Sequence, residues 1–262
     1  MTLLAVSPHL DDAAFSAGGT LAHLASRGHG VVVATVFTRS VAGPRGFALR
    51  CQTDKGLAPG ADYMAVRREE DRAACSALGA EPVWLDLEEA PHRGYEAPEA
   101  LFAGVLPHDA GLWREVRARL GALVAARRPG ALLSCQGLGQ HVDHLHVVRA
   151  VAALGAETGL PVLWWRDLPY AMREGAAAPA PGLPDGLQPL AVPLPPRALA
   201  AKLDACAAYG TQLPYQFGRD ADAPPEAAMR ARLAAFAHDE GRAAGGGRPA
   251  ERWLAPGGRA PW

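Results

Sequence analysis

The fold is decided by Leu3-Leu4-Ala5-Val6-Ser7-Pro8-His9-Leu10-Asp11-Asp12, residues 3–12 of the chain. The first four residues form a short apolar run of the kind that makes a buried β-strand, and polar residues follow it at once. Gly18-Gly19 comes soon after, but without the G-x-G-x-x-G spacing of a dinucleotide-binding loop. The stretch therefore predicts a strand that ends in a histidine and two carboxylates, and it does not favour nucleotide binding.

Apolar runs of the same kind alternate with helical patterns along the rest of the chain. Further strands are expected at 31–37, 83–87, 131–134 and 162–165, with a weaker one at 190–192. Their near-continuous hydrophobicity is typical of parallel strands that are covered on both faces. The alternation predicts an α/β fold, a Rossmann-like three-layer domain with a mostly parallel sheet.

Two of the helices between these strands have recognisable ends. Residues 66–78 carry acidic residues in their first half and stop at Gly79, and Asp109 is placed to cap a second helix. That second helix is marked by apolar residues at 112, 116, 120 and 123. We interpret both as crossover helices between parallel strands.

Residues 1–240 are expected to form one domain, followed by a Gly- and Pro-rich tail over 241–262. The tail pattern is typical of a flexible segment, although Trp253 and Trp262 offer apolar anchors. Within the domain, residues 40–62, 88–107 and 176–186 are long and irregular, and loops of this length tend to be functional. We interpret these three loops as candidate substrate walls.

The composition excludes several classes of protein. A chain of 262 residues with 49% hydrophobic residues buries a core that needs neither disulfides nor a structural metal. Its 26 basic and 27 acidic residues balance, and the arginines are scattered, so nothing provides a basic field for nucleic acid. Nucleic acid is therefore an unexpected partner.

The compartment is suggested by the cysteines and the apolar runs. The cysteines at 51, 75, 135 and 206 are widely spaced and are expected to be reduced. The start of the chain lacks the pattern of a secretory signal, and no apolar run reaches the ~18 residues of a membrane span. A cytoplasmic location is expected.

Chemistry-bearing side chains gather after two of the expected strands, where open α/β sheets bind their ligands. These residues are His9, Asp11, Asp12, His141, Asp143 and His144. Each segment alone also fits an ordinary helix start with solvated histidines. Together, imidazoles and carboxylates without paired cysteines favour a catalytic divalent metal, since a His₂Asp set leaves one position for water.

His9-Leu10-Asp11-Asp12 and His141-Val142-Asp143-His144 resemble the two hallmark motifs of the PIG-L (LmbE-like) family of zinc-dependent N-acetylglucosamine deacetylases. These motifs are usually written His-Pro-Asp-Asp-Glu and His-Pro-Asp-His. Residues 67–74, with Leu78-Gly79 behind them, resemble that family's Arg-x-x-Glu-x-x-Ala-Ala helix. The resemblance covers about residues 2–170 and continues more faintly beyond.

The resemblance implies one Zn²⁺ per chain, held by His9, Asp12 and His144. It also implies that Asp11 is the general base, that His141 stabilises or protonates the transition state, and that Asp143 orients His141. General chemistry agrees, because a carboxylate next to a ligand can take a proton from metal-activated water, and a cationic histidine can face an oxyanion.

Some positions depart from the family pattern. Leu10 and Val142 replace the motif prolines, and Ala13 replaces the motif glutamate. A tyrosine that often precedes the second motif is missing before His141, so its assisting role is either absent or supplied by another loop. None of these changes removes an expected ligand or the base.

Several other residues have two interpretations. Arg67 matches an arginine that contacts sugar hydroxyls in relatives, or else lies at a solvated helix end. Glu70 suits helix support, and His146 suits a surface position better than a role behind the metal ligands. The aromatic residues that suit either stacking on a sugar ring or ordinary packing are Trp164, Trp165 and Tyr170.

The function predicted from these observations is a zinc-dependent hydrolase that removes an N-acetyl group from an amino-sugar conjugate. One alternative is a zinc amidohydrolase that acts on a non-sugar N-acyl substrate. Another is a metal-holding binding module without turnover, although retention of Asp11 argues against it. The expected partner is the small-molecule conjugate, and a homo-oligomer stays open.

Overall fold

The computed structural model describes residues 1–173, 178–218 and 223–262. Its centre is a seven-stranded sheet with the order β3-β2-β1-β4-β5-β7-β6. The first five strands pair in parallel, and β7 runs antiparallel to both of its neighbours. The strands are β1 (Thr2–Ser7), β2 (Gly30–Phe37), β3 (Glu81–Leu87), β4 (Ala131–Cys135), β5 (Val162–Trp165), β6 (Leu187–Pro193) and β7 (Ala250–Pro256).

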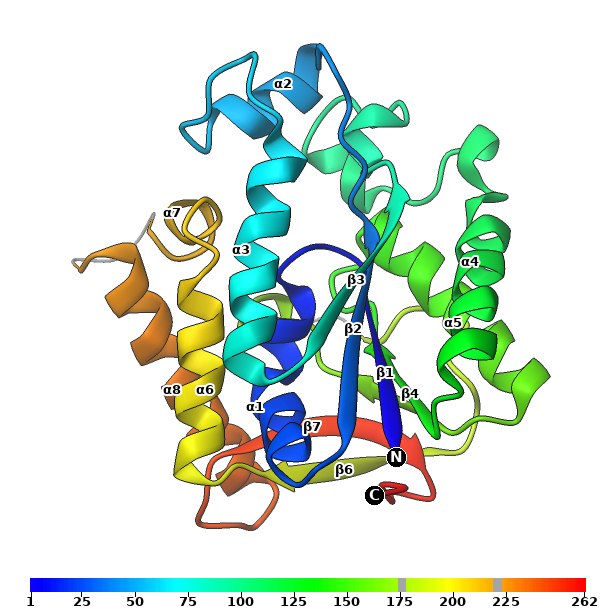
Figure 1. Ribbon diagram of the computed structural model, residues 1–262, viewed down its shortest axis with the longest axis vertical. Helices are drawn as coiled ribbons and strands as arrows, with labels where there is room; N and C mark the ends of the chain where they lie inside the picture. Colours follow the sequence, from blue (N-terminus) through cyan, green and yellow to red (C-terminus); the bar gives the residue numbers. More distant parts are fainter. Residues whose placement is uncertain (174–177, 219–222) are drawn as a thin grey trace.

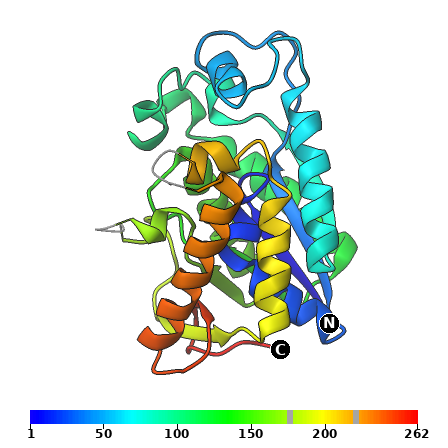
Figure 2. The ribbon, with the colours of Figure 1, turned by 90° about the vertical axis from the view of Figure 1, so that its left-hand side faces the viewer.

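Helices cover both faces of the sheet, which confirms the predicted three-layer α/β fold. Figure 1 shows α1, α3 and α6 together on one side, with α4 and α5 on the other. Figure 2 shows α8 beside α6 on the outside of the first layer. The helices are α1 (Asp12–Ser26), α2 (Gly46–Thr53), α3 (Tyr63–Leu78), α4 (Leu112–Arg127), α5 (Val142–Thr158), α6 (Pro196–Ala207), α7 (Leu213–Phe217) and α8 (Pro225–Ala243).

The central strand β1 is apolar throughout because both of its faces are covered. Leu3, Leu4, Ala5 and Val6 are fully buried. The ends of α3 follow from its sequence, since the Asp62 carboxylate caps the N–H of Ala65 and Gly79 stops the helix in the left-handed conformation.

The position of the site follows from the crossovers at β1 and β4. These two strands are hydrogen-bonded neighbours, yet β1 leads into α1 on one face and β4 leads into α5 on the other. The chain therefore diverges at their carboxyl ends, and such a divergence is where open parallel sheets bind ligands.

The structure differs from the expected flexible tail. Residues 250–256 form β7 within the sheet, between β5 and β6, and Trp253 is buried against Trp165 with ring centroids 5.9 Å apart. The aromatic anchor therefore outweighs the flexibility of the glycines before it, and this part of the chain belongs to the domain.

The three expected irregular loops also contain some structure. Residues 40–62 include α2, and residues 88–107 include the 3₁₀ turns Ala90–His92 and Glu99–Phe102. Of the third loop, residues 176 and 177 lie outside the described residues, and 178–186 contain two turns before β6. Among the helices of the described ranges, none combines the length and the apolar character that a membrane crossing requires.

Candidate metal centre and active site

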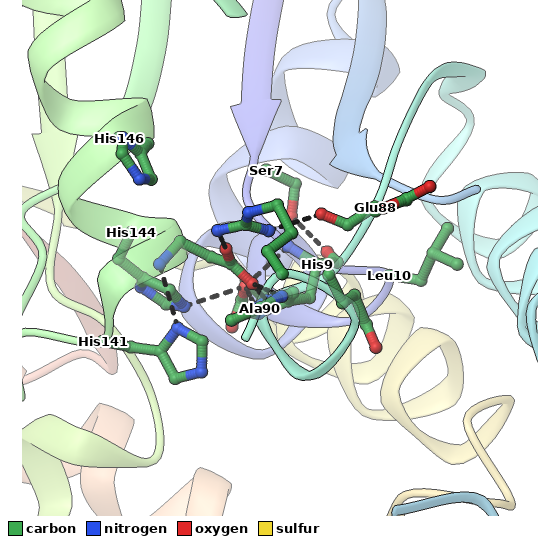
Figure 3. Close-up of polar contacts among 12 residues, drawn as sticks. Ser7, His9, Leu10, Glu88, Ala90, His141, His144 and His146 are labelled. Atoms are coloured by element: carbon green, nitrogen blue, oxygen red, sulfur yellow. Dashed lines mark hydrogen bonds and ion pairs between the residues drawn. The ribbon is translucent and has the colours of Figure 1, made fainter. Parts of the chain in front are cut away.

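Three predicted ligands meet where β1 and β4 end. His9 lies in the loop after β1, Asp12 is the first residue of α1, and His144 lies in the first turn of α5. Asp12 Oδ2 is 3.2 Å from His9 Nδ1 and 3.3 Å from His144 Nε2. One ligand atom from each residue lies within 4.8 Å of the others, and Figure 3 shows His9, His141 and His144 gathered at this point. The three residues can therefore share one cation.

The surroundings of His144 fit a metal ligand. Within the described part of the chain its buried Nε2 has no hydrogen-bond partner, while its Nδ1 is 2.7 Å from Asp167 Oδ1. Asp167 is fixed in turn, because its Oδ2 accepts the N–H of Leu138 at 3.1 Å. A carboxylate on one imidazole nitrogen leaves the other nitrogen free to bind a metal, and this is the usual support of histidine ligands.

Sequence reasoning did not single out Asp167 as a support of His144. The available signal was its position just after the strand that ends at Trp165, next to β4 in the sheet. Carboxylates at that edge of a parallel sheet lie close to ligands from the neighbouring strands.

Asp143 contacts a different histidine from the one expected. Its Oδ2 is 2.9 Å from His9 Nε2 and accepts the N–H of Ala90 at 3.1 Å, while its Oδ1 accepts from Arg93 at 2.7 Å. His141 is bound instead through the backbone, since its Nδ1 accepts the N–H of Asp143 at 3.2 Å and caps α5. The Asp143 carboxylate therefore supports His9, because Arg93 and the 88–107 loop meet it on that side.

The protonation of the three residues follows from their packing. Burial lowers the pKa of His9, yet its contacts with Asp12 and Asp143 raise the pKa to about 9. Burial acts in the same direction on His144, but the Asp12 charge holds its pKa well above the usual range. Burial alone would raise the pKa of Asp12, and His144 brings it well below the usual range instead. A cation that binds here would have to displace protons from both histidines, so its affinity would rise with pH.

Asp11 lies beside this group and contacts other side chains. Burial raises the pKa of Asp11 to about 7, opposed by the charge of Arg67. Its Oδ2 is 3.4 Å from Arg67 Nη2 and accepts from Gln216 Nε2 at 3.1 Å. A carboxylate with a pKa near neutrality can both accept and return a proton, as a general base must.

His141 is neutral in this environment. Burial lowers its pKa to about 3, with the nearby charges of His9 and His144 acting in the same direction. Because Nδ1 accepts a backbone hydrogen bond, the neutral ring carries its hydrogen on Nε2. His141 therefore offers a hydrogen-bond donor, in contrast to the cation that was expected.

The solvated interpretation of Arg67 is wrong. Its side chain is 4% exposed, and it donates to Glu89 Oε1 at 2.7 Å and to the carbonyl of Leu10 at 2.8 Å. Its Nε has no hydrogen-bond partner among the described residues, which leaves one donor free. The start of α3 packs against the loop after β1, and this packing buries Arg67.

The surface interpretation of His146 is also wrong. His146 is 2% exposed and its Nε2 lies 3.1 Å from Asp109 Oδ2. Asp109 does not cap α4, whose N-cap is Gly111, and it is buried over α5 instead. The segment before α4 covers this face of α5, and the helical pattern of His146 could not reveal that cover.

The aromatic residues divide into core and site residues. Trp164 and Trp165 are fully buried in β5 and pack in the core, so they offer no face to a sugar. Tyr170 lies at the site, with its ring centroid 5.7 Å from that of His144. Gly139 makes this possible, because a Cβ there would come within 2.5 Å of the Tyr170 ring.

The family model of the GlcNAc-PI de-N-acetylases, PIG-L, matches residues 4–154. The chain belongs to the PIG-L family. The match includes both motifs and the Arg67 helix, and it ends within α5. Tyr170 lies beyond the match, and in this PIG-L chain its ring lies next to that of His144.

Deacetylases are among the proteins similar to this PIG-L chain. The 2'-N-acetylparomamine deacetylase of Streptomyces fradiae is 34% identical over 176 residues, which are 66% of this chain. The match spans 59% of the length of that relative.

Several solved structures match over almost the whole chain, and two of them are deacetylases of antibiotics. The zinc-inhibited form of teicoplanin deacetylase is 29% identical, covers 97% of each chain and has a TM-score of 0.83. The deacetylase of the A40926 pseudoaglycone is 32% identical, covers 97% of this chain and 96% of its own, and has a TM-score of 0.81. Both likenesses extend past the family match into α8 and β7.

Proposed function

We propose that this protein is a zinc-dependent hydrolase, with one zinc per chain, that removes an N-acetyl group from an amino-sugar conjugate. The observation that carries the proposal is the group of His9, Asp12 and His144, in which the buried Nε2 of His144 makes no hydrogen bond within the described residues and faces Asp12, with Asp11 next in the chain to Asp12. Deacetylases among the similar proteins support the reaction class.

A divalent cation bound there would supply Lewis acidity, which lowers the pKa of a water molecule to about 7 and polarises an amide carbonyl. Asp11 accepts the proton of the attacking water. Arg67 and Gln216 hold the Oδ2 of Asp11 in place, so the carboxylate needs little rearrangement. The protonated Asp11 then returns the proton to the departing amine.

His141 acts as a neutral donor in this proposal. Its Nε2–H donates a hydrogen bond to the oxygen that gains negative charge as water attacks the carbonyl. The backbone N–H of Asp143 keeps the ring in the required tautomer. Fixed donors of this kind are most effective in a water-poor site, and His141 is 7% exposed.

The substrate is an amino-sugar conjugate in this proposal, and the loops at 40–62 and 88–107 are its walls. In this proposal Arg67 contributes to substrate binding by holding Asp11 and Glu89 in place beside the sugar. The four cysteines are free, which suits the reducing cytoplasm that we propose as its location.

Acetate release tests the function. The purified chain, loaded with zinc, is incubated with N-acetylglucosaminides and with N-acetylated aminoglycoside and glycopeptide sugars, beside N-acyl amino acids. We expect acetate from the sugars, and none after treatment with a chelator. Release from the N-acyl amino acids alone would favour the non-sugar amidohydrolase, and metal binding without any release would favour the binding module.

A further inference from the structure

An arginine from the 88–107 loop bridges two buried carboxylates beside the metal group. Arg93 Nη2 donates to Asp143 Oδ1 at 2.7 Å and to Asp109 Oδ2 at 3.1 Å, and its Nε donates to Asp109 Oδ1 at 3.1 Å. The side chain is 10% exposed. Arg93 thus joins the loop to Asp143 of α5 and to the segment before α4.

Asp143 is the end of this bridge that touches the metal group. Its carboxylate is fully buried, and the oxygen that Arg93 leaves free accepts from His9 Nε2 and from the N–H of Ala90. His9 turns its other nitrogen, Nδ1, toward Asp12. The ring orientation of His9 is therefore set by Asp143 on one side and by the metal group on the other.

Asp109 anchors the other end. Its Oδ2 accepts from the hydroxyl of Tyr95 at 2.9 Å and lies 3.1 Å from His146 Nε2. The Tyr95 hydroxyl in turn accepts the N–H of Leu106 at 3.0 Å, which ties the far part of the loop to the same point. Asp109 is held by groups from two elements, so it can fix Arg93.

Packing leaves the guanidinium one orientation. It lies 4.9 Å from the ring centroid of Phe37 and 5.8 Å from that of Tyr95, and Nη1 donates to the carbonyl of Glu88. Phe37 also lies next to His9, with ring centroids 6.1 Å apart. A movement of the Arg93 side chain would therefore change the position of the His9 ring, because Asp143 and Phe37 each contact both residues.

We propose that Arg93 is a positioning residue that fixes the ring of His9, acting through Asp143, and so sets how firmly the metal is held. This inference rests on the proposed role of His9 as a metal ligand. The planar fork of arginine reaches two carboxylates at once, whereas a lysine ammonium is a point donor that can satisfy one of them. If Arg93 no longer binds Asp143, the Asp143 carboxylate can move, and it then fixes the His9 ring less firmly.

The test replaces Arg93 and measures metal binding directly. Arg93→Lys keeps the charge and removes the fork. Arg119→Lys is the matched control, because Arg119 of α4 also donates to two acceptors, Glu115 and the carbonyl of Leu85, and neither belongs to the metal group. Each folded protein is loaded with Co²⁺ for its visible spectrum and with zinc for its release to a coloured chelator. We expect zinc release about 10–100-fold faster in Arg93→Lys and a changed cobalt spectrum, with both unchanged in the control.

Asp109→Asn provides a second route if Arg93→Lys does not fold. It preserves the shape of Asp109 and the contact between Arg93 and Asp143, while it weakens the anchor. We expect a smaller acceleration of zinc release in the same direction. A double variant should release zinc no faster than Arg93→Lys, because both changes act along one chain of contacts.

The readouts separate this inference from the proposed function, since they need no substrate. Unchanged zinc release and an unchanged cobalt spectrum in a folded but less stable Arg93→Lys would show a merely structural arginine and overturn the inference alone. A wild-type protein that binds neither metal would overturn both the inference and the proposed function. Metal-loaded protein without acetate release would overturn only the latter.

Discussion

Replacing Asp11 with asparagine separates the general base from the metal ligands. The amide keeps the shape of the side chain, and the proposed ligands His9, Asp12 and His144 stay in place, so the metal should remain bound. The proton acceptor is lost, which typically lowers the rate about 10²–10⁴-fold, or raises the barrier by about 3–5 kcal/mol. Asp12→Ala should behave in the opposite order, with the metal lost first.

The same substitution has an expected effect on stability. Burial raises the pKa of Asp11 from 3.8 to about 7 in the folded protein. The folded state then binds more protons than the unfolded chain between these values, so this contribution to stability is present at low pH and is lost as pH rises through that window. Above pH 7 the ionised, buried Asp11 destabilises the metal-free protein by on the order of a few kcal/mol.

Asp11→Asn removes that charge. Arg67 keeps its contact with Glu89 and is not left without a carboxylate partner. Metal-free Asp11→Asn should therefore unfold at a temperature no lower than the wild type at pH 8, and the difference should shrink toward pH 4.

Three measurements on the purified variants decide the assignment. These are metal content by elemental analysis, acetate release from the best substrate, and thermal unfolding after chelator treatment at several pH values. The exposed Asp54, changed to asparagine, is the matched control. Full activity in Asp11→Asn would refute the general base, and loss of metal from Asp11→Asn with retention in Asp12→Ala would invert the two roles.

Three further predictions concern the metal and two buried ion pairs. Removing the metal should abolish activity and lower the unfolding temperature, and one equivalent of zinc should restore both; recovery only at two equivalents would contradict a single site. Arg67→Ala leaves Glu89 and Asp11 without their cation and should cost about 3–5 kcal/mol in denaturant unfolding, whereas unchanged stability would show that this buried ion pair does not stabilise the fold. Lys202→Met leaves the buried Glu251 without its cation and should lower the free energy of unfolding by a similar amount. The double variant Lys202→Met, Glu251→Gln should regain part of that stability. A Lys202→Met protein as stable as the wild type would contradict this prediction.

Much of the fold could be predicted from the sequence because parallel strands are buried on both faces. Each expected strand lies within an observed one, and where the ends differ the observed strand is one to three residues longer. β7 was missed because its seven residues end in Pro256 and follow a glycine-rich segment, which hid a strand that depends on pairing with β5 and β6. The signal that favoured it was Trp253, which needs a place to be buried.

The meeting of His9, Asp12 and His144 could be predicted because each follows directly after a strand or opens a helix. The side chains that hold these three residues in place could not be predicted from the sequence. Arg93, Asp109 and Asp167 act across 16 to 50 residues of sequence, and such pairs leave no local pattern. The predicted surface position of His146 was wrong for the same reason, because a segment that precedes α4 buries this residue.

Glu251 makes the first helix of the chain depend on its last strand, β7. Its carboxylate accepts the N–H groups of Gly19 and Thr20 in α1 and pairs with Lys202 of α6. α1 begins with Asp12, so the helix that carries a proposed zinc ligand is completed by a strand that the ribosome makes more than 200 residues later. During translation α1 therefore lacks its contacts with Glu251 until β7 has been made. A chain that ends before β7 should be less stable than the full chain, because two amides of α1 and the buried Lys202 then lose their carboxylate partner.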